Sequence, residues 1–122
     1  MKQQELEDRL LTFGVNVVRL TKLMPGNSAS INLKNQIVRS GTAPSLMYGE
    51  ACAAESSRDF IHKMALALKE LRETKMCLRL ILMNDYVASN HASPLIDENE
   101  QLIRIFWRSI ETAKRNRLND AK

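Results

Sequence analysis

The feature that most constrains the fold of this chain is a regular seam of apolar residues near its N-terminus. The apolar side chains recur at alternating steps of four and three residues: Leu6, Leu10, Phe13, Val17, Leu20 and Met24. This spacing aligns them on one face of an α-helix of about five turns, whereas a strand would scatter them over both of its faces. Such a helix is stable only when its apolar face packs against other elements. The seam therefore predicts a helix that belongs to a larger helical core.

Three further segments show helical spacing of apolar residues and are bounded by turn or capping residues. Pro25 and Gly26 end the first segment, Ser56 or Ser57 starts the third, and Pro94 suits the first turn of the fourth. The predicted helices span residues 3–24, 28–54, 57–88 and 94–118. Short connections between four helices favour an all-α, antiparallel, up-down-up-down four-helix bundle, with residues 1–122 as one domain.

Composition constrains the cellular location of the protein and the redox state of its cysteines. No stretch approaches the roughly 20 apolar residues of a membrane span, and the charged N-terminus lacks the apolar run of a signal peptide. We therefore expect a cytoplasmic protein. In that compartment the two cysteines, Cys52 and Cys77, are expected to be buried, reduced and unpaired.

No pattern in the chain predicts catalysis or metal binding. Asp59 and His62 have the spacing of a di-iron bundle, but a second such motif and inward-facing glutamates are missing. Gly41 and Gly49 match neither a P-loop nor a dinucleotide-binding loop. We expect no catalytic residues, no metal, no cofactor and no small-molecule substrate, and hence a protein that is not an enzyme.

Basic side chains follow one flank of the third predicted helix and one flank of the fourth, in a chain of net charge +4. The nucleic-acid-binding candidates are Lys69, Arg72, Lys75, Arg79, Arg104, Arg108, Lys114, Arg115 and Arg117. Such stripes neutralise phosphates and release counterions. The alternative is a solvated surface of ion pairs within helices, namely Glu100–Arg104, Glu111–Arg115 and Lys69–Glu73. The charge pattern leaves both interpretations open.

Several apolar residues lie outside the inward-facing seams of the predicted helices. These oligomer-interface candidates are Leu66, Leu80, Leu102 and Trp107. A small monomeric bundle does not bury two faces of every helix, so the excess favours a homo-oligomer.

Short motifs along the chain carry a family resemblance. They are Gln36, Arg39-Ser40, Gly49-Glu50, Asp59-Phe60 and the run Glu70-Leu71-x-Glu73-Thr74. With these motifs, the chain resembles the four helix bundle protein family, also called the 23S rRNA intervening-sequence protein family, from Leu10 to Arg117. The resemblance implies that the run around Gly41 lies within the second helix, which Pro44 bends; a local break at this point is the alternative.

The resemblance also implies a function. Related accessory proteins of diversity-generating retroelements suggest a ring-shaped homo-pentamer that binds nucleic acid or a nucleic-acid enzyme, and the family supplies no catalytic residues. We therefore expect a non-enzymatic, oligomeric accessory or scaffold protein that binds RNA or DNA phosphates through the basic helix stripes. The alternative is a protein–protein adaptor with no role in nucleic-acid binding.

Overall fold

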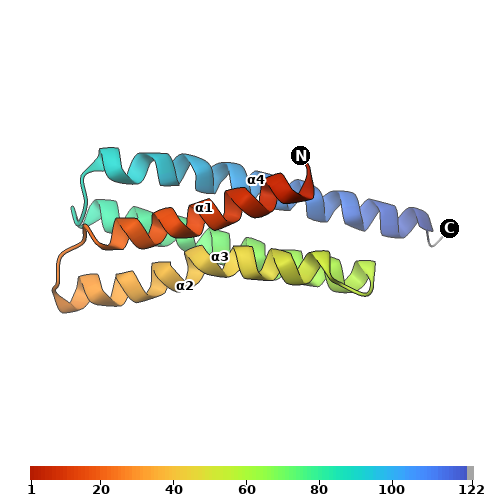
Figure 1. The fold of residues 1–122 in the computed structure, drawn as a ribbon, viewed down its shortest axis with the longest axis horizontal. Helices are drawn as coiled ribbons and strands as arrows, with labels where there is room; N and C mark the ends of the chain where they lie inside the picture. Colours follow the sequence, from red (N-terminus) through yellow and green to blue (C-terminus); the bar gives the residue numbers. More distant parts are fainter. Residues whose placement is uncertain (121–122) are drawn as a thin grey trace.

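Four helices lie side by side and alternate in direction in the computed structural model, which describes residues 1–120 (Figure 1). They are α1 (Gln3–Thr21), α2 (Ser28–Cys52), α3 (Ser57–Met83) and α4 (Ser89–Asp120). These residues contain no strand, which confirms the predicted all-α, up-down-up-down bundle. Residues 121–122 of the predicted domain lie outside the described part of the chain.

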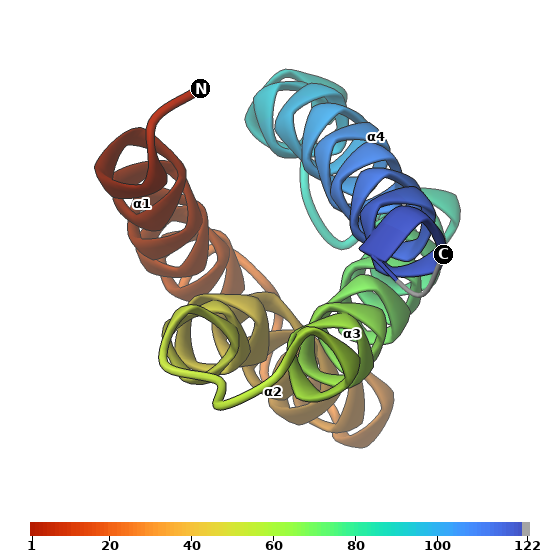
Figure 2. The ribbon, with the colours of Figure 1, turned by 90° about the vertical axis from the view of Figure 1, so that its right-hand side faces the viewer.

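Each helix packs against its neighbours in the sequence, and α1 also meets α4 (Figure 2). The end-on view shows that α1 and α3 occupy opposite corners of the bundle, and the alternation makes these two helices parallel. The contact between α1 and α4 is the sparsest of the four neighbouring pairs. The bundle is therefore closed tightly on three sides and loosely on the fourth.

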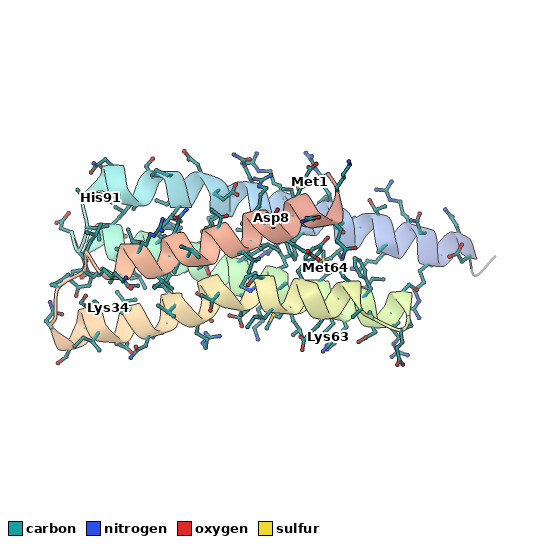
Figure 3. The ribbon with its side chains drawn as sticks, in the orientation of Figure 1. Met1, Asp8, Lys34, Lys63, Met64 and His91 are labelled. Atoms are coloured by element: carbon teal, nitrogen blue, oxygen red, sulfur yellow. The ribbon has the colours of Figure 1, made fainter. Side chains whose placement is uncertain are left out.

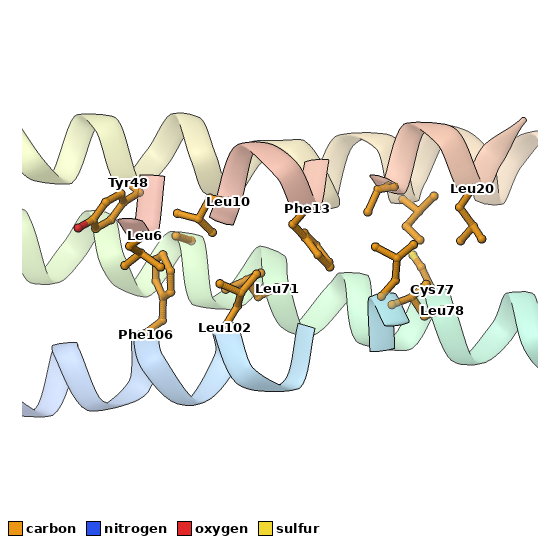
Figure 4. Packing of buried hydrophobic residues seen from close by; sticks show 14 of the residues in the cluster. Leu6, Leu10, Phe13, Leu20, Tyr48, Leu71, Cys77, Leu78, Leu102 and Phe106 are labelled. Carbon is orange, nitrogen blue, oxygen red and sulfur yellow. The ribbon is translucent and has the colours of Figure 1, made fainter. Parts of the chain in front are cut away.

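The core contains the whole predicted seam of α1, against which apolar side chains of the other three helices pack (Figure 4). Tyr48 of α2 packs edge-on against Phe106 of α4, with ring centroids 5.9 Å apart. Leu102 also belongs to this core, because it lies one turn before Phe106 and is fully buried beside Leu71. The expectation that Leu102 contributes to an oligomer interface is therefore wrong.

α1 and α2 approach each other closely at a glycine. A Cβ atom added to Gly41 would lie only 2.8 Å from Cγ2 of Val17, whose side chain is itself fully buried. α2 continues through Gly41 and Pro44 as one helix, so the structure supports the continuous helix and not the local break. Figure 1 shows this helix changing direction where its colour passes from orange to yellow. The bend follows from the missing N–H of Pro44.

α3 ends at Met83 and not at residue 88, because the chain turns left-handed at Asp85, two residues later. Asp85 has a φ of 56°, and the N–H of Tyr86 donates a hydrogen bond to the carbonyl oxygen of Ile81 at 3.1 Å. This pattern is a Schellman motif, which usually places glycine at the left-handed position. Aspartate tolerates that conformation better than most residues, so the helix ends without a glycine signal.

α4 starts at Ser89, so the predicted start at Pro94 is wrong. Pro94 lies in the second turn, where it has no N–H to donate to the carbonyl of Asn90. Ala92 is fully buried, so packing of the first turn against the bundle outweighs the lost hydrogen bond. At the other end, the last turns of α4 extend beyond the other three helices (Figure 1).

No helix within residues 1–120 is both long and apolar enough to cross a membrane. α1 and α2 end a few residues before their predicted limits of 24 and 54.

Candidate functional site

An exposed arginine joins α2 to α3 through two glutamates. Nη1 of Arg39 donates to Oε2 of Glu70 at 2.9 Å, and its Nη2 pairs with Glu73. The hydrogen bond to Glu73 and the charges of both carboxylates raise the pKa of Arg39. The guanidinium therefore stays charged and bridges the two helices at the surface.

Buried hydroxyl groups continue this contact beneath the arginine. Oγ1 of Thr74 lies 2.9 Å from Oγ of Ser40, and it donates a hydrogen bond of 2.9 Å to the carbonyl oxygen of Glu70. Ser40 and Thr74 are both fully buried. We call Arg39, Ser40, Glu70, Glu73 and Thr74 the α2–α3 polar cluster.

The cysteines are free, and one of them lies beside this cluster. Burial raises the pKa of the Cys77 thiol, which keeps it protonated and a weak nucleophile. Cys52 is only half-buried, so the prediction that both thiols are buried is wrong for this one. Neither environment resembles the electropositive site of a catalytic cysteine.

A three-residue contact, the Arg9 bridge, joins α1 to α4. Nε of Arg9 donates to Oε2 of Glu98 at 3.0 Å, and Nη2 donates to Oε1 of Gln101 at 3.1 Å. On the far side of this bridge a cleft of about 640 Å³ opens between the two helices. Its floor contains Phe13 and Leu95, and Glu98, the carboxylate that lines it, is already held by Arg9.

Asp59 and His62, which have the spacing of a metal-binding bundle, belong to no metal site within the described residues. Asp59 lies in the first turn of α3, where its backbone N–H donates to Oγ of the N-cap Ser56 at 3.0 Å. His62 is exposed, and so is His91, which lies in the first turns of α4 (Figure 3). Nowhere in residues 1–120 do three His, Cys, Asp or Glu side chains gather as metal ligands.

The structure separates the basic candidates into paired and unpaired side chains. Nζ of Lys75 lies 2.9 Å from Oε1 of Glu100, and Nζ of Lys114 lies 3.9 Å from Oε1 of Glu111. The exposed candidates without an ion pair within residues 1–120 are Lys69, Arg72, Arg79, Arg104, Arg108, Arg115 and Arg117.

The predicted pairs within helices are therefore not the ones that form. Glu73 pairs with Arg39 of α2, Glu100 pairs with Lys75 of α3, and Glu111 pairs with Lys114. The predicted partners Lys69, Arg104 and Arg115 remain free in this part of the chain, and none of the three predicted pairs is formed.

The basic flank of α3 and the basic flank of α4 lie next to each other, because the two helices pack side by side. The Lys75–Glu100 pair shows that the flank of α3 with Arg72 and Arg79 faces α4, since these residues are one turn before and after Lys75. On α4, Arg104 lies one turn beyond Glu100, and Arg108 and Arg115 continue along its exposed side. We call the resulting set the basic surface: Arg72, Arg79, Arg104, Arg108 and Arg115.

The remaining oligomer-interface candidates differ in exposure. Leu66 is half-buried, whereas Leu80 and Trp107 are 48% and 52% exposed. The structure adds exposed apolar residues that the sequence analysis missed, among them Leu11, Val15, Val18, Leu46 and Met83. The residues on α1 have helical spacing of their own, beside the inward seam, and that spacing was a signal that could have revealed them.

A protein-family model described as 23S rRNA-intervening sequence protein matches residues 2–108 of this chain. The chain belongs to this family. This chain is also similar to a solved structure, a protein of unknown function from the S23 ribosomal protein family of Bacteroides thetaiotaomicron VPI-5482. That structure is 30% identical to this chain, covers 91% of it and 99% of its own chain, and superposes with a TM-score of 0.83. No functionally curated protein matches this chain.

The motifs that resemble the 23S rRNA-intervening sequence family have a structural role in this chain. Arg39-Ser40 and the Glu70 to Thr74 run are far apart in the sequence, yet they form the α2–α3 polar cluster. Their side chains bind one another and pair the two helices. These motif residues therefore help to hold α2 against α3 in this chain.

Proposed function

We propose that this chain is a non-enzymatic, homo-oligomeric accessory protein that binds nucleic-acid phosphates through the basic surface. The observation that supports this most is the set of exposed arginines on α3 and α4 that have no carboxylate partner within residues 1–120. An unpaired guanidinium keeps its donors for a phosphate. Each phosphate it neutralises releases counterions.

Assembly strengthens such binding. A single copy offers few phosphate contacts, but linked copies raise the effective concentration of every further contact. The ring of five that the resemblance implies would place several basic surfaces on one particle. Weak contacts of each copy then add up to useful affinity for a long nucleic acid.

Trp107 offers a second kind of contact beside the arginines. It is 52% exposed, follows Arg104 by three positions and directly precedes Arg108. Exposed aromatic rings next to cationic groups serve as stacking platforms for unpaired bases. We therefore propose that single-stranded RNA or DNA is bound better than a duplex, in which the bases are already stacked.

Intrinsic fluorescence tests the proposal directly, because the chain contains one tryptophan. Oligouridylate, oligothymidylate and a DNA duplex are titrated at low salt and then through a salt series. We expect quenching by the single strands, with affinity that falls steeply and log-linearly as salt rises. The double variant Arg104→Gln/Arg108→Gln should bind about tenfold or more weakly, since each phosphate contact is worth roughly 1 kcal/mol. Lys34→Gln on α2 is the matched control and should bind like the wild type.

The adaptor hypothesis is the second candidate, and the Lys75–Glu100 and Lys114–Glu111 pairs favour it, because they neutralise part of the basic stripes. In that case the remaining arginines keep the protein soluble, and a protein partner docks elsewhere. Absence of binding to all three nucleic acids at low salt would contradict the phosphate-binding proposal and leave the adaptor. Light scattering tests the oligomer separately, since a monomer mass at all micromolar concentrations would contradict it.

A further inference from the structure

We infer that the cleft between α1 and α4 binds a small amphipathic carboxylate, an unbranched aliphatic chain that ends in a carboxylate group. This inference goes beyond the proposed function, because the cleft shares no residue with the basic surface. Four observations carry it: the size and direction of the cleft, its apolar floor, the charges along its rim and the loose packing of the two helices around it.

The size and direction of the cleft suit a small, elongated molecule. Its volume of about 640 Å³ lies within the range of about 300–1,000 Å³ that is usual for small-molecule sites. Its lining on α1 extends from Thr12 to Leu20, which corresponds to roughly 12 Å of helix axis. Leu23, just after α1, prolongs the cleft at the end away from the Arg9 bridge. Because the space follows two antiparallel helices, an extended chain can lie along it.

The floor of the cleft is apolar and belongs to the core. Phe13, Leu20 and Leu95 all line it and are nevertheless buried, so packing beneath them fixes their positions. Leu23 is 52% exposed and offers further apolar surface. Each CH₂ group that moves from water onto such a surface strengthens binding by up to about fourfold. The floor therefore favours an aliphatic chain over a polar molecule of the same length.

The rim supplies a cation and a polar donor for the head group. Arg19 lines the cleft near the end of α1; it is exposed and has no ion pair in the described part of the chain. Its planar guanidinium can hold a carboxylate through two parallel hydrogen bonds. His91 lines the cleft from the start of α4, at the same end of the bundle (Figure 3), and its imidazole adds an N–H donor. Both side chains select an anion at this end.

The carboxylate of Glu98 does not oppose an anionic ligand. Glu98 lines the cleft at the Arg9 bridge, where Nε of Arg9 donates to its Oε2 at 3.0 Å and compensates its charge. Arg19 lies ten residues after Arg9, or about 15 Å along α1. The uncompensated charge on the lining is therefore the positive charge of Arg19, well away from Glu98. We place the ligand with its carboxylate at Arg19 and its chain directed towards the Arg9 bridge.

The loose packing of α1 against α4 gives the ligand a stabilising effect. This contact is the sparsest of the four neighbouring helix pairs. A chain that packs between Phe13 of α1 and Leu95 of α4 adds apolar contacts where the bundle has the fewest. A ligand that binds only the folded state stabilises it by mass action. Binding should therefore raise the melting temperature and slow hydrogen exchange in α1.

The test is a calorimetric titration with sodium octanoate, decanoate and dodecanoate, each below the concentration at which it forms micelles. We expect saturable binding of one molecule per chain, with affinity that rises about two- to fourfold for each added CH₂ group. Decyltrimethylammonium has the same chain as a decyl carboxylate but a cationic head group. It is the matched ligand control and should bind about tenfold more weakly, because Arg19 repels it. Thermal melts should show stabilisation by decanoate and not by the cation.

Three variants locate the site. Arg19→Gln should weaken decanoate binding about fivefold, the effect of one partly exposed ion pair. Arg58→Gln is the matched control, because Arg58 is also exposed and without an ion pair among the described residues, but lies at the start of α3, at the other end of the bundle. Asn16→Phe places a ring in the cleft, which Asn16 lines as a half-buried residue, and should abolish binding. Circular dichroism should show that all three variants keep their helices.

Other outcomes overturn the inference in distinguishable ways. Absence of saturable binding by all three carboxylates contradicts the site itself and leaves the proposed nucleic-acid binding untouched. Equal affinity for decanoate and decyltrimethylammonium contradicts the role of Arg19 and the carboxylate head group. Binding that Asn16→Phe does not change contradicts the cleft as its location. If Asn16→Phe changes the mass of the protein in light scattering while the wild type binds no carboxylate, a second protein chain covers the cleft and the small ligand is excluded.

Discussion

The α2–α3 and α1–α4 contacts close the same bundle in opposite ways. α2 and α3 share a buried Ser40–Thr74 hydroxyl contact beneath an arginine that holds two glutamates. α1 and α4 share apolar core contacts and one polar contact, the Arg9 bridge, and a cleft opens beyond that bridge. The first contact specifies register through several directional interactions, whereas the second has the Arg9 bridge as its directional interaction within residues 1–120. The comparison indicates that α2 and α3 form the structural centre of the bundle and that α1 is its most separable helix.

Truncation of core leucines should give the largest contrast between the two regions. Leu71→Ala, at a fully buried position of α3, should lower the free energy of unfolding by about 4 kcal/mol. Leu95→Ala beside the cleft should lower it by about 2 kcal/mol, because the open side lets neighbours relax and water enter. Urea denaturation of both variants measures the difference. Equal losses would show that the α1–α4 side is packed as rigidly as the α2–α3 side.

A methyl group added at the α1–α2 contact should have the next largest effect. In Gly41→Ala the new Cβ would lie 2.8 Å from the buried Val17, so we expect a loss of about 1–3 kcal/mol from overpacking. Gly14→Ala is the matched control, because its Cβ would meet its nearest atom, the carbonyl oxygen of Gly41, at an ordinary 3.5 Å. Thermal melts of the two variants should differ clearly. A stable Gly41→Ala protein would mean that α1 shifts away from α2 at little cost.

Removal of the buried Ser40–Thr74 contact should lower the free energy of unfolding by less. The effects of the two substitutions should not be additive. Thr74→Val keeps the shape of the side chain and removes its hydrogen bonds, which should cost about 1 kcal/mol. Ser40→Ala should cost a similar amount, and the double variant should cost less than the sum, because the two groups satisfy each other. Chemical denaturation of all four proteins completes the cycle. Additive losses would show that the two hydroxyls act independently.

The smallest change in stability is expected at the Arg9 bridge. Arg9→Gln should change the free energy of unfolding by less than about 1 kcal/mol, as is usual for partly exposed ion pairs. Hydrogen exchange should respond more, with faster exchange in α1 and unchanged exchange in α3. Arg39→Gln is the counterpart at the α2–α3 contact, where the buried hydroxyls remain and local exchange should stay slow. Unchanged exchange in α1 would show that the bridge does not hold this helix.

The sequence predicted the fold because apolar spacing identifies the four helices and, in α1, every residue of the inward face. It misplaced Leu102 because two adjacent apolar residues, Leu102 and Ile103, compete for that face and only packing decides between them. It misplaced the start of α4 because burial of Ala92 is a tertiary effect that a proline signal does not contain.

The candidate site was less predictable for a related reason. The spacing of charged residues predicts ion pairs within one helix, whereas Lys75 and Arg39 pair with glutamates of a neighbouring helix. Which flank faces which neighbour depends on the assembled bundle. The unpaired state of Arg104 could therefore be recognised only after Glu100 had been placed against Lys75.

The length of α4 has a consequence for its thermal behaviour. Its last turns extend past the other helices, and a helical segment of that size has little helicity alone in water (Figure 1). The part of α4 that packs against the bundle acts as the nucleus from which these turns propagate. The positive charge of Arg117, near the C-terminus of α4, interacts favourably with the helix dipole. Warming should therefore fray α4 from its free end while the bundle stays folded. Arg115 and Arg117 would then meet a phosphate from a partly melted segment, and binding there would be accompanied by helix formation.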